Sequence, residues 1–173
     1  MRQSLKRFPD SHGDAVTAIA VDAAWLRVGV LLLSYEVTGD IDELRLPAVG
    51  ATARADELWQ HTCFEAFVRP GSSPAYIEFN FAPSTQWAAY EFDGYRRGMR
   101  TADTAAPRID IQVAPARLNL QATLELGALP PGPWRLGLSA VIEEANGRLS
   151  YWALAHPVGR PDFHHADCFI CEI

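Results

Sequence analysis

The sequence predicts an all-β protein, an antiparallel β-sandwich of the jelly-roll kind with little helix. Apolar and polar residues alternate every second position over long stretches, which is typical of half-buried strands. Turn residues such as Asn146-Gly147 separate these stretches at short intervals. No segment repeats apolar residues at helical spacing. A closed barrel is the alternative, and the 173 residues suit a single domain, 1–173.

In chain order, the first strands are expected at Thr17–Val21 and Leu26–Val37. The second of these carries one alternating apolar face, made of Leu26, Val28, Val30 and Leu32. Val37–Ala55 reads as a long loop with a short strand near Leu44–Leu46. Ala53–Leu58 has room for one helical turn.

The next element is a hairpin with strands Thr62–Val68 and Ala75–Phe81 around the turn Arg69–Pro74. One face of this hairpin is strongly apolar and is assigned to the core: Phe64, Ala66, Val68, Ala75, Ile77, Phe79 and Phe81. If Val68 lies opposite Ala75, the other face pairs Phe67 with Tyr76, Glu65 with Glu78, and Cys63 with Asn80.

Two glutamates directly opposite each other on a sheet repel, so the sequence calls for something that offsets the repulsion. Four arrangements would do this. Arg96 or Arg97 from the following loop could lie between the acids, or a cation such as calcium could bind them. A hydroxyl-rich ligand could donate to them, or one raised pKa could leave a shared proton.

The later part of the chain continues the strand pattern. Perfect alternation over Leu118–Leu126 and again over Trp134–Ile142 predicts two long strands, with Trp134 in the core. A hairpin signal at Asn146-Gly147 leads into the strand LSYWALA, residues 149–155. Phe163–Ile173 is aromatic and branched enough to predict a final strand.

Aromatic rings gather around the paired acids in the sequence. Sugars are held by rings that stack on their C–H faces while acids, amides and guanidinium groups bond to their hydroxyls. We therefore predict a ligand site with these members: Trp59, Glu65, Glu78, Asn80, Trp87, Tyr95, Arg96, Trp152 and His164. The plainer alternative is a solvated sheet face whose acids point to water.

Composition excludes several classes of partner. The net charge of −6, with no block of Lys or Arg, argues against nucleic acid. The longest apolar run, Val28–Leu33, is too short to cross a membrane, and no signal-peptide pattern opens the chain. The odd count of three cysteines fits a reducing compartment, so a cytoplasmic protein is expected. An aromatic-rich face also allows self-association into a homo-oligomer.

The histidine- and cysteine-containing segment from His156 to Cys171 raises the question of a metal site. On a strand Cys168 and Cys171 would point to opposite faces, and no second ligand pair is present, so zinc is not favoured. The alternative is a loop tied by Asp and His side chains. Cys63 with a histidine has no local catalytic signature, and GxSxG and HExxH motifs are absent from the sequence. An enzyme is therefore not the favoured reading.

The stretches LWQHTCFEAFVRP, YIEFNFAPSTQWAAYEFDGYRRGM and YWALAHPVGRPDFHH, with the closing DCF, make the chain resemble DOMON-like proteins of the family 9 carbohydrate-binding-module type. The resemblance runs from about Trp25 to the C-terminus. It implies a β-sandwich that binds a sugar or haem, usually without enzymatic activity. In the carbohydrate-binding relatives a D-x-x-E-x-F motif contributes to the site; Glu65 and Phe67 match its last two positions, and Thr62 replaces the first acid.

Three functions follow as hypotheses. The first is a module that binds a carbohydrate or glycan fragment, without a required cofactor. The second, implied by the haem-binding branch of the resemblance, uses Met99 and one of His61, His156, His164 and His165 as axial ligands. The third is a glycoside hydrolase using Glu65 and Glu78, since directly opposed strand residues suit the carboxylate spacing of about 5–5.5 Å in retaining enzymes.

Overall fold

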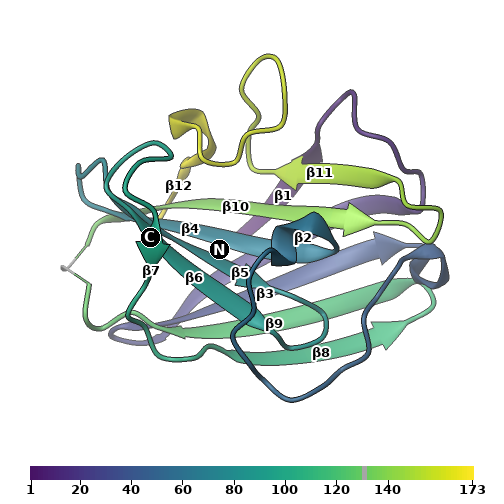
Figure 1. Cartoon of the computed structure of the whole chain (residues 1–173), viewed down its shortest axis with the longest axis horizontal. Coiled ribbons are helices and arrows are strands. Elements are labelled where there is room, and N and C mark those ends of the chain that lie inside the picture. The colour runs from purple at the N-terminus through teal and green to yellow at the C-terminus, as the bar shows by residue number, and fades with distance from the viewer. Residues whose placement is uncertain (130–131) are drawn as a thin grey trace.

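The computed structural model describes residues 1–129 and 132–173, and their regular secondary structure is almost entirely antiparallel β-strand, as predicted. The strands follow one curled path that forms two facing layers (Figure 1). Sheet A has the order β1 (Arg2–Arg7), β2 (Val16–Arg27), β3 (Val30–Gly39), β9 (Arg117–Glu125) and β8 (Arg108–Ala114). Sheet B has the order β7 (Arg100–Thr101), β6 (Trp87–Phe92), β5 (Tyr76–Phe81), β4 (Cys63–Pro70), β10 (Trp134–Glu143) and β11 (Leu149–Ala153).

Strand β1 belongs to both layers. Its residues 2–5 pair with β2, and Lys6 and Arg7 pair with Ala153 and Trp152 of β11. A short final strand, β12 (Cys171–Glu172), pairs with β10. The two sheets are therefore joined by hydrogen bonds along one side of the sandwich.

The main core fills the space between the sheets. Because strand side chains alternate, each sheet turns one apolar set inward. Sheet A contributes Leu31, Leu33, Tyr35, Val37, Leu118, Leu120 and Leu124, and sheet B contributes Phe64, Ala66, Val68, Phe79, Phe81, Leu136 and Leu138. Tyr35 links the layers directly, since its hydroxyl donates to the backbone carbonyl of Glu65 at 2.7 Å.

We expect Tyr35→Phe to lower the free energy of unfolding by about 1 kcal/mol, because a buried hydrogen bond is lost while the ring packing against Phe64 is kept. Urea unfolding measures the change. Tyr151→Phe is the matched control, since its half-buried ring packs on Phe163. An equal loss in both variants would contradict the role assigned to the Tyr35 hydroxyl.

The predicted hairpin forms, but its register differs from the expected one by two residues. Val68 pairs with Ile77 instead of Ala75, so Glu65 lies opposite Asn80 and Phe67 opposite Glu78. The expected pairings Phe67–Tyr76, Glu65–Glu78 and Cys63–Asn80 are wrong. The loop takes up the extra residues because β4 runs on to Pro70, beside Trp134 of β10. A shift of two residues leaves every side chain on its predicted face.

The N-terminal strands have different bounds from those expected. Strand β2 continues to Arg27, and the chain reverses at Val28-Gly29, where Gly29 has a φ of +75°. Leu26 and Val28 are therefore exposed, and the expected apolar face of Leu26, Val28, Val30 and Leu32 is wrong. The core-facing residues of β3 begin at Leu31 and continue with Leu33, Tyr35 and Val37.

The C-terminal region departs furthest from the prediction. Of the strand expected over Phe163–Ile173, only β12 forms; the preceding residues make a loop with one short helix, η3 (Ala166–Cys168). Side chains stabilise this loop by taking backbone donors away from a strand. Asp162 accepts from the backbone N–H of His164 at 3.2 Å, and His165 accepts from that of Asp167 at 3.3 Å.

The other helical pieces are also single turns. Helix η1 (Ile41–Glu43) lies in the long loop after β3, where Leu44 makes one bridge to Glu144. Helix η2 (Leu58–Gln60) lies just after the predicted turn. Strands β1 and β8 were not predicted. Within the described residues, no helix is long and apolar enough to cross a membrane.

Candidate functional site

The outer face of sheet B carries a second apolar cluster and, inside it, a buried polar network. The cluster contains Phe67, Tyr76, Ala88, Tyr90, Phe92, Val141, Ala153, Phe163 and Phe169. The loop before β7, residues 93–99, and the C-terminal loop, the yellow segment of Figure 1, are tied together over this face by the ion pair of Arg96 and Asp162, at 2.8 Å.

Glu65 and Glu78 lie at the base of this network, on one face as predicted. Only 3% of Glu65 and 6% of Glu78 is exposed. Ser139 donates to Glu65 Oε2 at 3.1 Å, and Asn80 Nδ2 donates to Glu78 Oε1 at 2.7 Å. Cys63 Sγ lies 3.5 Å from Asn80 Oδ1. The acids are therefore held by neutral donors, Ser139 from the neighbouring strand β10 and Asn80 from two positions further along β5.

Burial decides the ionisation of these acids. It raises the pKa of Glu65 to about 8, with the nearby Glu78 carboxylate as the second cause; the Ser139 hydrogen bond and the Arg96 charge oppose the rise. Burial also raises the pKa of Glu78, against the Asn80 hydrogen bond and the Arg96 charge. Of the four ways to offset the repulsion, proton uptake is the main one here, and Arg96 assists.

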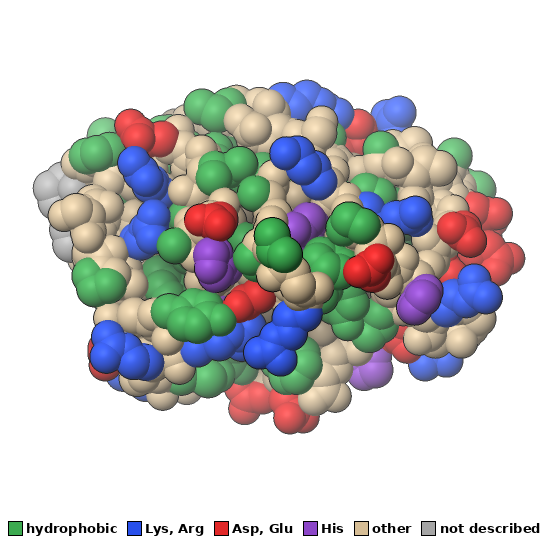
Figure 2. Space-filling model, turned by 90° about the horizontal axis from the view of Figure 1, so that it is seen from above, with side chains coloured by type: hydrophobic (Ala, Val, Ile, Leu, Met, Phe, Trp, Pro, Cys, Tyr) green, Lys and Arg blue, Asp and Glu red, His purple; other side chains and the backbone are tan. Residues whose placement is uncertain are grey.

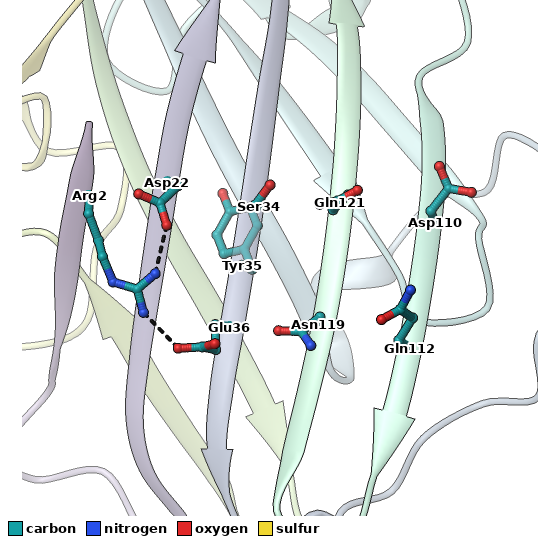
Figure 3. A pocket seen from close by; sticks show the side chains of 9 residues that line it. All are labelled: Arg2, Asp22, Ser34, Tyr35, Glu36, Asp110, Gln112, Asn119 and Gln121. Atoms are coloured by element: carbon teal, nitrogen blue, oxygen red, sulfur yellow. Dashed lines mark hydrogen bonds and ion pairs between the residues drawn. The ribbon is translucent and has the colours of Figure 1, made fainter.

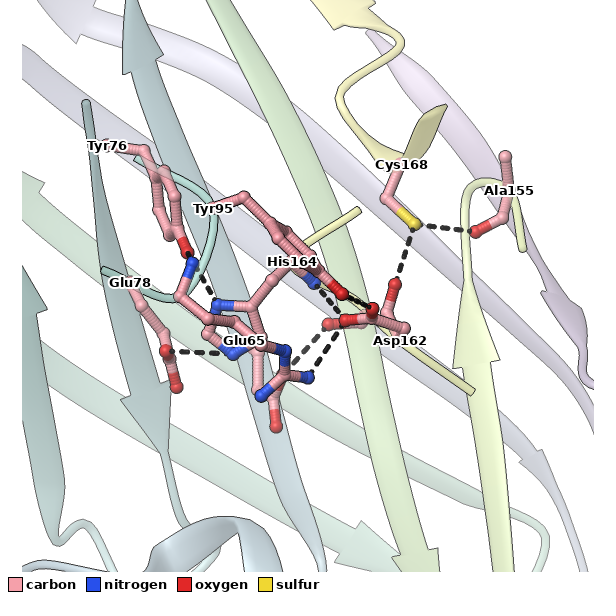
Figure 4. Close-up of polar contacts among 10 residues, drawn as sticks. Glu65, Tyr76, Glu78, Tyr95, Ala155, Asp162, His164 and Cys168 are labelled. Carbon is pink, nitrogen blue, oxygen red and sulfur yellow. Dashed lines mark hydrogen bonds and ion pairs between the residues drawn. The ribbon is translucent and has the colours of Figure 1, made fainter. Parts of the chain in front are cut away.

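His164 forms the next layer. Its Nδ1 lies 2.7 Å from the Tyr76 hydroxyl, which also accepts from the backbone N–H of Arg96 at 3.3 Å (Figure 4). Burial, and then the Arg96 charge, lower the pKa of His164 to about 4, so the ring is neutral at neutral pH. Tyr76 then donates to Nδ1, and the ring proton on Nε2 faces Glu78 Oε2, 3.6 Å away.

The outermost layer is charged and partly open to solvent. Arg96 donates to Asp162 Oδ1, and the hydroxyl of the half-exposed Tyr95 donates to Asp162 Oδ2 at 2.5 Å. Burial by itself would raise the pKa of Asp162, but the bonds from Tyr95 and Arg96 outweigh it and lower that pKa. Arg96 has a φ of +50°, a strained conformation for a non-glycine residue that is often found at functional sites.

A cavity of about 430 Å³ opens beside this network. Trp59 on η2 lines it with half of its surface exposed, together with Tyr90 of β6 and Met99. Tyr90 donates to Asp56 at 2.6 Å and lies opposite Glu78 in the β5–β6 pair. The cavity is thus connected to the carboxylate network through Tyr90.

The structure brings seven of the nine predicted site residues to this side of sheet B: Trp59, Glu65, Glu78, Asn80, Tyr95, Arg96 and His164. Trp87 and Trp152 do not lie there. Both are buried in the core between the sheets, where Trp87 packs under the Arg54 guanidinium and Trp152 donates to Ser150.

Sequence reasoning missed several contributors: Asp56, Tyr76, Tyr90, Ser139 and Asp162. Tyr76 could have been identified from the sequence, because the alternation of side chains already placed it on the same face as Glu78. Asp162, which follows Pro161 in a loop expected to be tied by Asp and His side chains, could also have been identified.

The haem hypothesis does not fit these residues. Met99 is exposed, and the cavity that it lines contains acids, Arg100 and Thr101 but no histidine among the described residues. His164 is engaged by Tyr76, and His61 by Glu143 at 2.7 Å. In the described parts of the chain, no group of three or more His, Cys, Asp and Glu is arranged so that it could hold a metal ion.

Seen from above, the molecule shows acidic, basic and histidine side chains scattered among hydrophobic ones (Figure 2). Neither the acidic nor the basic side chains cover one continuous part of the face in this view.

No family model matches the sequence, and neither does any curated protein. Solved structures do match the fold. One is a protein of Bacteroides uniformis ATCC 8492 assigned provisionally as carbohydrate-binding, with a TM-score of 0.69 and 16% identity over 98% of this chain and 84% of that one.

Two further matches are structures of a family 9 carbohydrate-binding module from Caldicellulosiruptor kristjanssonii. The complex with cellotriose has a TM-score of 0.57 and 11% identity, over 90% of this chain and 74% of that one. The complex with glucose has a TM-score of 0.51 and 11% identity, over 82% and 69%. The chain therefore shares the β-sandwich fold of carbohydrate-binding modules.

Proposed function

We propose that this protein is a carbohydrate-binding module that holds a glycan fragment on the outer face of sheet B, beside Trp59, Tyr95 and Arg96. One observation carries the proposal. Two half-exposed rings, Trp59 and Tyr95, lie on the same side of sheet B as the half-exposed guanidinium of Arg96, which Asp162 holds beside a buried polar network. Rings that can stack on sugar C–H faces, beside fixed hydrogen-bonding groups, are what recognition of a neutral sugar requires.

The position of the two rings supports one continuous site. Trp59 shares its cavity with Met99, and Tyr95 and Arg96 belong to the loop that leads to Met99. A ligand seated on Trp59 would meet Asp56 and Arg100 at the cavity wall. The fold match with modules solved in complex with glucose and cellotriose adds support for a glucose-type ligand.

The same geometry favours binding over hydrolysis. A glycosidase needs both carboxylates in contact with the scissile bond. Glu65 and Glu78 instead lie on a diagonal of the sheet, beneath His164 and almost without exposed surface. Their position suits acids that support the side chains of the site, and it does not suit acids that attack a substrate.

We expect Trp59→Ala and Tyr95→Ala each to weaken carbohydrate binding by about 10-fold or more, because each removes a ring that can stack on the ligand. Isothermal titration calorimetry with glucose, cellotriose and xylotriose measures the affinities. Trp25→Ala is the matched control, since Trp25 is similarly exposed but packs on Trp134 at another part of the sandwich.

Far-ultraviolet circular dichroism should show all three variants folded. The proposal fails if the folded wild-type protein binds none of a broader panel of neutral glycans. It also fails if Trp25→Ala weakens binding as much as Trp59→Ala does.

A further inference from the structure

The outer face of sheet A contains a polar hollow that the proposed function does not use. It has a volume of about 200 Å³ and draws side chains from all five strands of the sheet (Figure 3). The lining residues are Arg2, Asp22, Ser34, Glu36, Asp110, Gln112, Asn119 and Gln121, with Tyr35 between them. The Tyr35 ring itself is buried in the core, so the hollow has no aromatic platform.

Strand pairing sets these side chains in two rows across the sheet. The pairs Arg2–Asp22, Asp22–Ser34, Ser34–Gln121 and Gln121–Asp110 make one row. Glu36, Asn119 and Gln112 make the neighbouring row. Since adjacent strands lie about 4.8 Å apart, the longer row extends over roughly 20 Å.

The charges along this hollow are compensated within the protein. Arg2 bonds Asp22 at 2.7 Å and Glu36 at 2.6 Å. Arg117 lies 3.4 Å from Glu36, and Arg108 bonds Asp110 at 2.9 Å. A charged ligand would have to break these pairs, whereas a neutral ligand would not.

Unlike the charged side chains of the hollow, its amide side chains are not engaged by other side chains. Among the described residues, the side chains of Gln112, Asn119 and Gln121 have no hydrogen-bond partner (Figure 3). Each amide offers both donors and an acceptor, which matches a hydroxyl that also donates and accepts. Three such groups lie on adjacent strands, flanked by the Ser34 hydroxyl.

From this arrangement we propose a second binding site, on sheet A, for a neutral oligosaccharide that lies across β3, β9 and β8. Over these three strands the rows extend about 10 Å, which suits a chain of two or more sugar units better than a single one. Binding is by hydrogen bonds to hydroxyls without ring stacking. This site is on sheet A, whereas Trp59 lies at sheet B. The proposal can therefore be tested independently of the site proposed on sheet B.

The test is a nuclear magnetic resonance titration of ¹⁵N-labelled full chain with cellotetraose, xylotetraose and maltotetraose, each to 20 mM. We expect at least one to shift the side-chain amide signals of Asn119 and Gln121. Asn119→Ala and Gln121→Ala should each weaken that binding by about 2- to 10-fold, the range that follows from the loss of one or two hydrogen bonds. Trp59→Ala should leave it unchanged.

Thr38→Ala is the matched control, because Thr38 lies on the same face of β3, opposite Arg117 and outside the hollow. The proposal is overturned if none of the three tetrasaccharides shifts these amides, or if Thr38→Ala weakens binding as much as Asn119→Ala does. It is also overturned if the wild-type protein dimerises in size-exclusion chromatography and Asn119→Ala abolishes the dimer, since the face would then bind a second copy.

Discussion

Glu65→Gln should stabilise the protein at alkaline pH and remove much of the pH dependence of its stability. The pKa of Glu65 is about 8 in the folded protein, against an ordinary value of 4.5. Between these values the unfolded chain releases a proton that the folded protein keeps, so the free energy of unfolding falls as the pH rises from about 4.5 to 8. The loss is on the order of 3–5 kcal/mol.

Glutamine carries no titrating proton, yet its side-chain oxygen can still accept from Ser139. Urea unfolding at pH 5, 7 and 9 should therefore give nearly equal stabilities for wild type and Glu65→Gln at pH 5. The variant should be clearly more stable at pH 9. Glu172→Gln, at an exposed position of β12, serves as the control. Parallel pH profiles for wild type and Glu65→Gln would show that Glu65 is ionised in the folded state.

The protonation states have a consequence for the proposed glycan site. With Glu65 protonated and His164 neutral at neutral pH, Glu78 is the one of these three groups that can carry a charge at the base of the network. The charge of Arg96 above it is matched by Asp162. A site of this kind has no strong field to select an ion, which agrees with a neutral carbohydrate as the ligand.

The sequence predicted the fold where one face of a strand is buried and the other is solvated. This is the case for β9 and the sheet A side of the sandwich, where Leu118, Leu120 and Leu124 alternate with polar residues. Strand β8 was not predicted; it is an edge strand, and its alternating residues pass from buried Ile109 through half-buried Ile111 to exposed Val113. Its burial pattern depends on a neighbour that the local sequence does not identify.

The sequence placed some residues of the candidate site correctly and others wrongly. The alternation of side chains along a strand was enough to place Glu65, Glu78 and Asn80 on one face. The error of two residues in the predicted register does not change that conclusion, because a shift of two keeps each side chain on its face. Trp87 and Trp152 were misplaced because sheet B has aromatic residues on both faces. Which face holds the larger core depends on where sheet A packs, and local alternation carries no such information.

The sequence pattern could not identify the residue that pairs with Arg96, and the reason is a different one. Asp162 lies 66 positions later in the chain, in a loop whose path is set by its own side-chain to backbone hydrogen bonds. The aromatic and branched residues around it favoured a strand. Local hydrogen bonding outweighs that preference here, and it is this loop that completes the outer layer of the network.

Asp162→Ala should therefore have a large effect on both stability and glycan binding. It removes the acceptor for Arg96, Tyr95 and the backbone N–H of His164, and it leaves Arg96 without its counter-charge. We expect the free energy of unfolding to fall by about 2 kcal/mol, as for the loss of one partner of a partly buried, charge-assisted network. Glycan affinity should fall by about 10-fold or more, because Tyr95 and Arg96 lose their fixed positions.

Two further variants test whether Asp162 acts through its charge or through its hydrogen bonds, and whether the effect is specific to Asp162. Asp162→Asn keeps an acceptor oxygen but no charge, so its losses should be smaller than those of Asp162→Ala. Asp93→Ala breaks a more exposed pair with Arg100 in the same loop and should cost less than about 1 kcal/mol. Urea unfolding and calorimetric titration with the best-bound glycan measure both effects. If Asp93→Ala and Asp162→Ala prove equally mild, the two loops are held over sheet B by apolar packing of Phe163 and Phe169, and Arg96 is not positioned by Asp162.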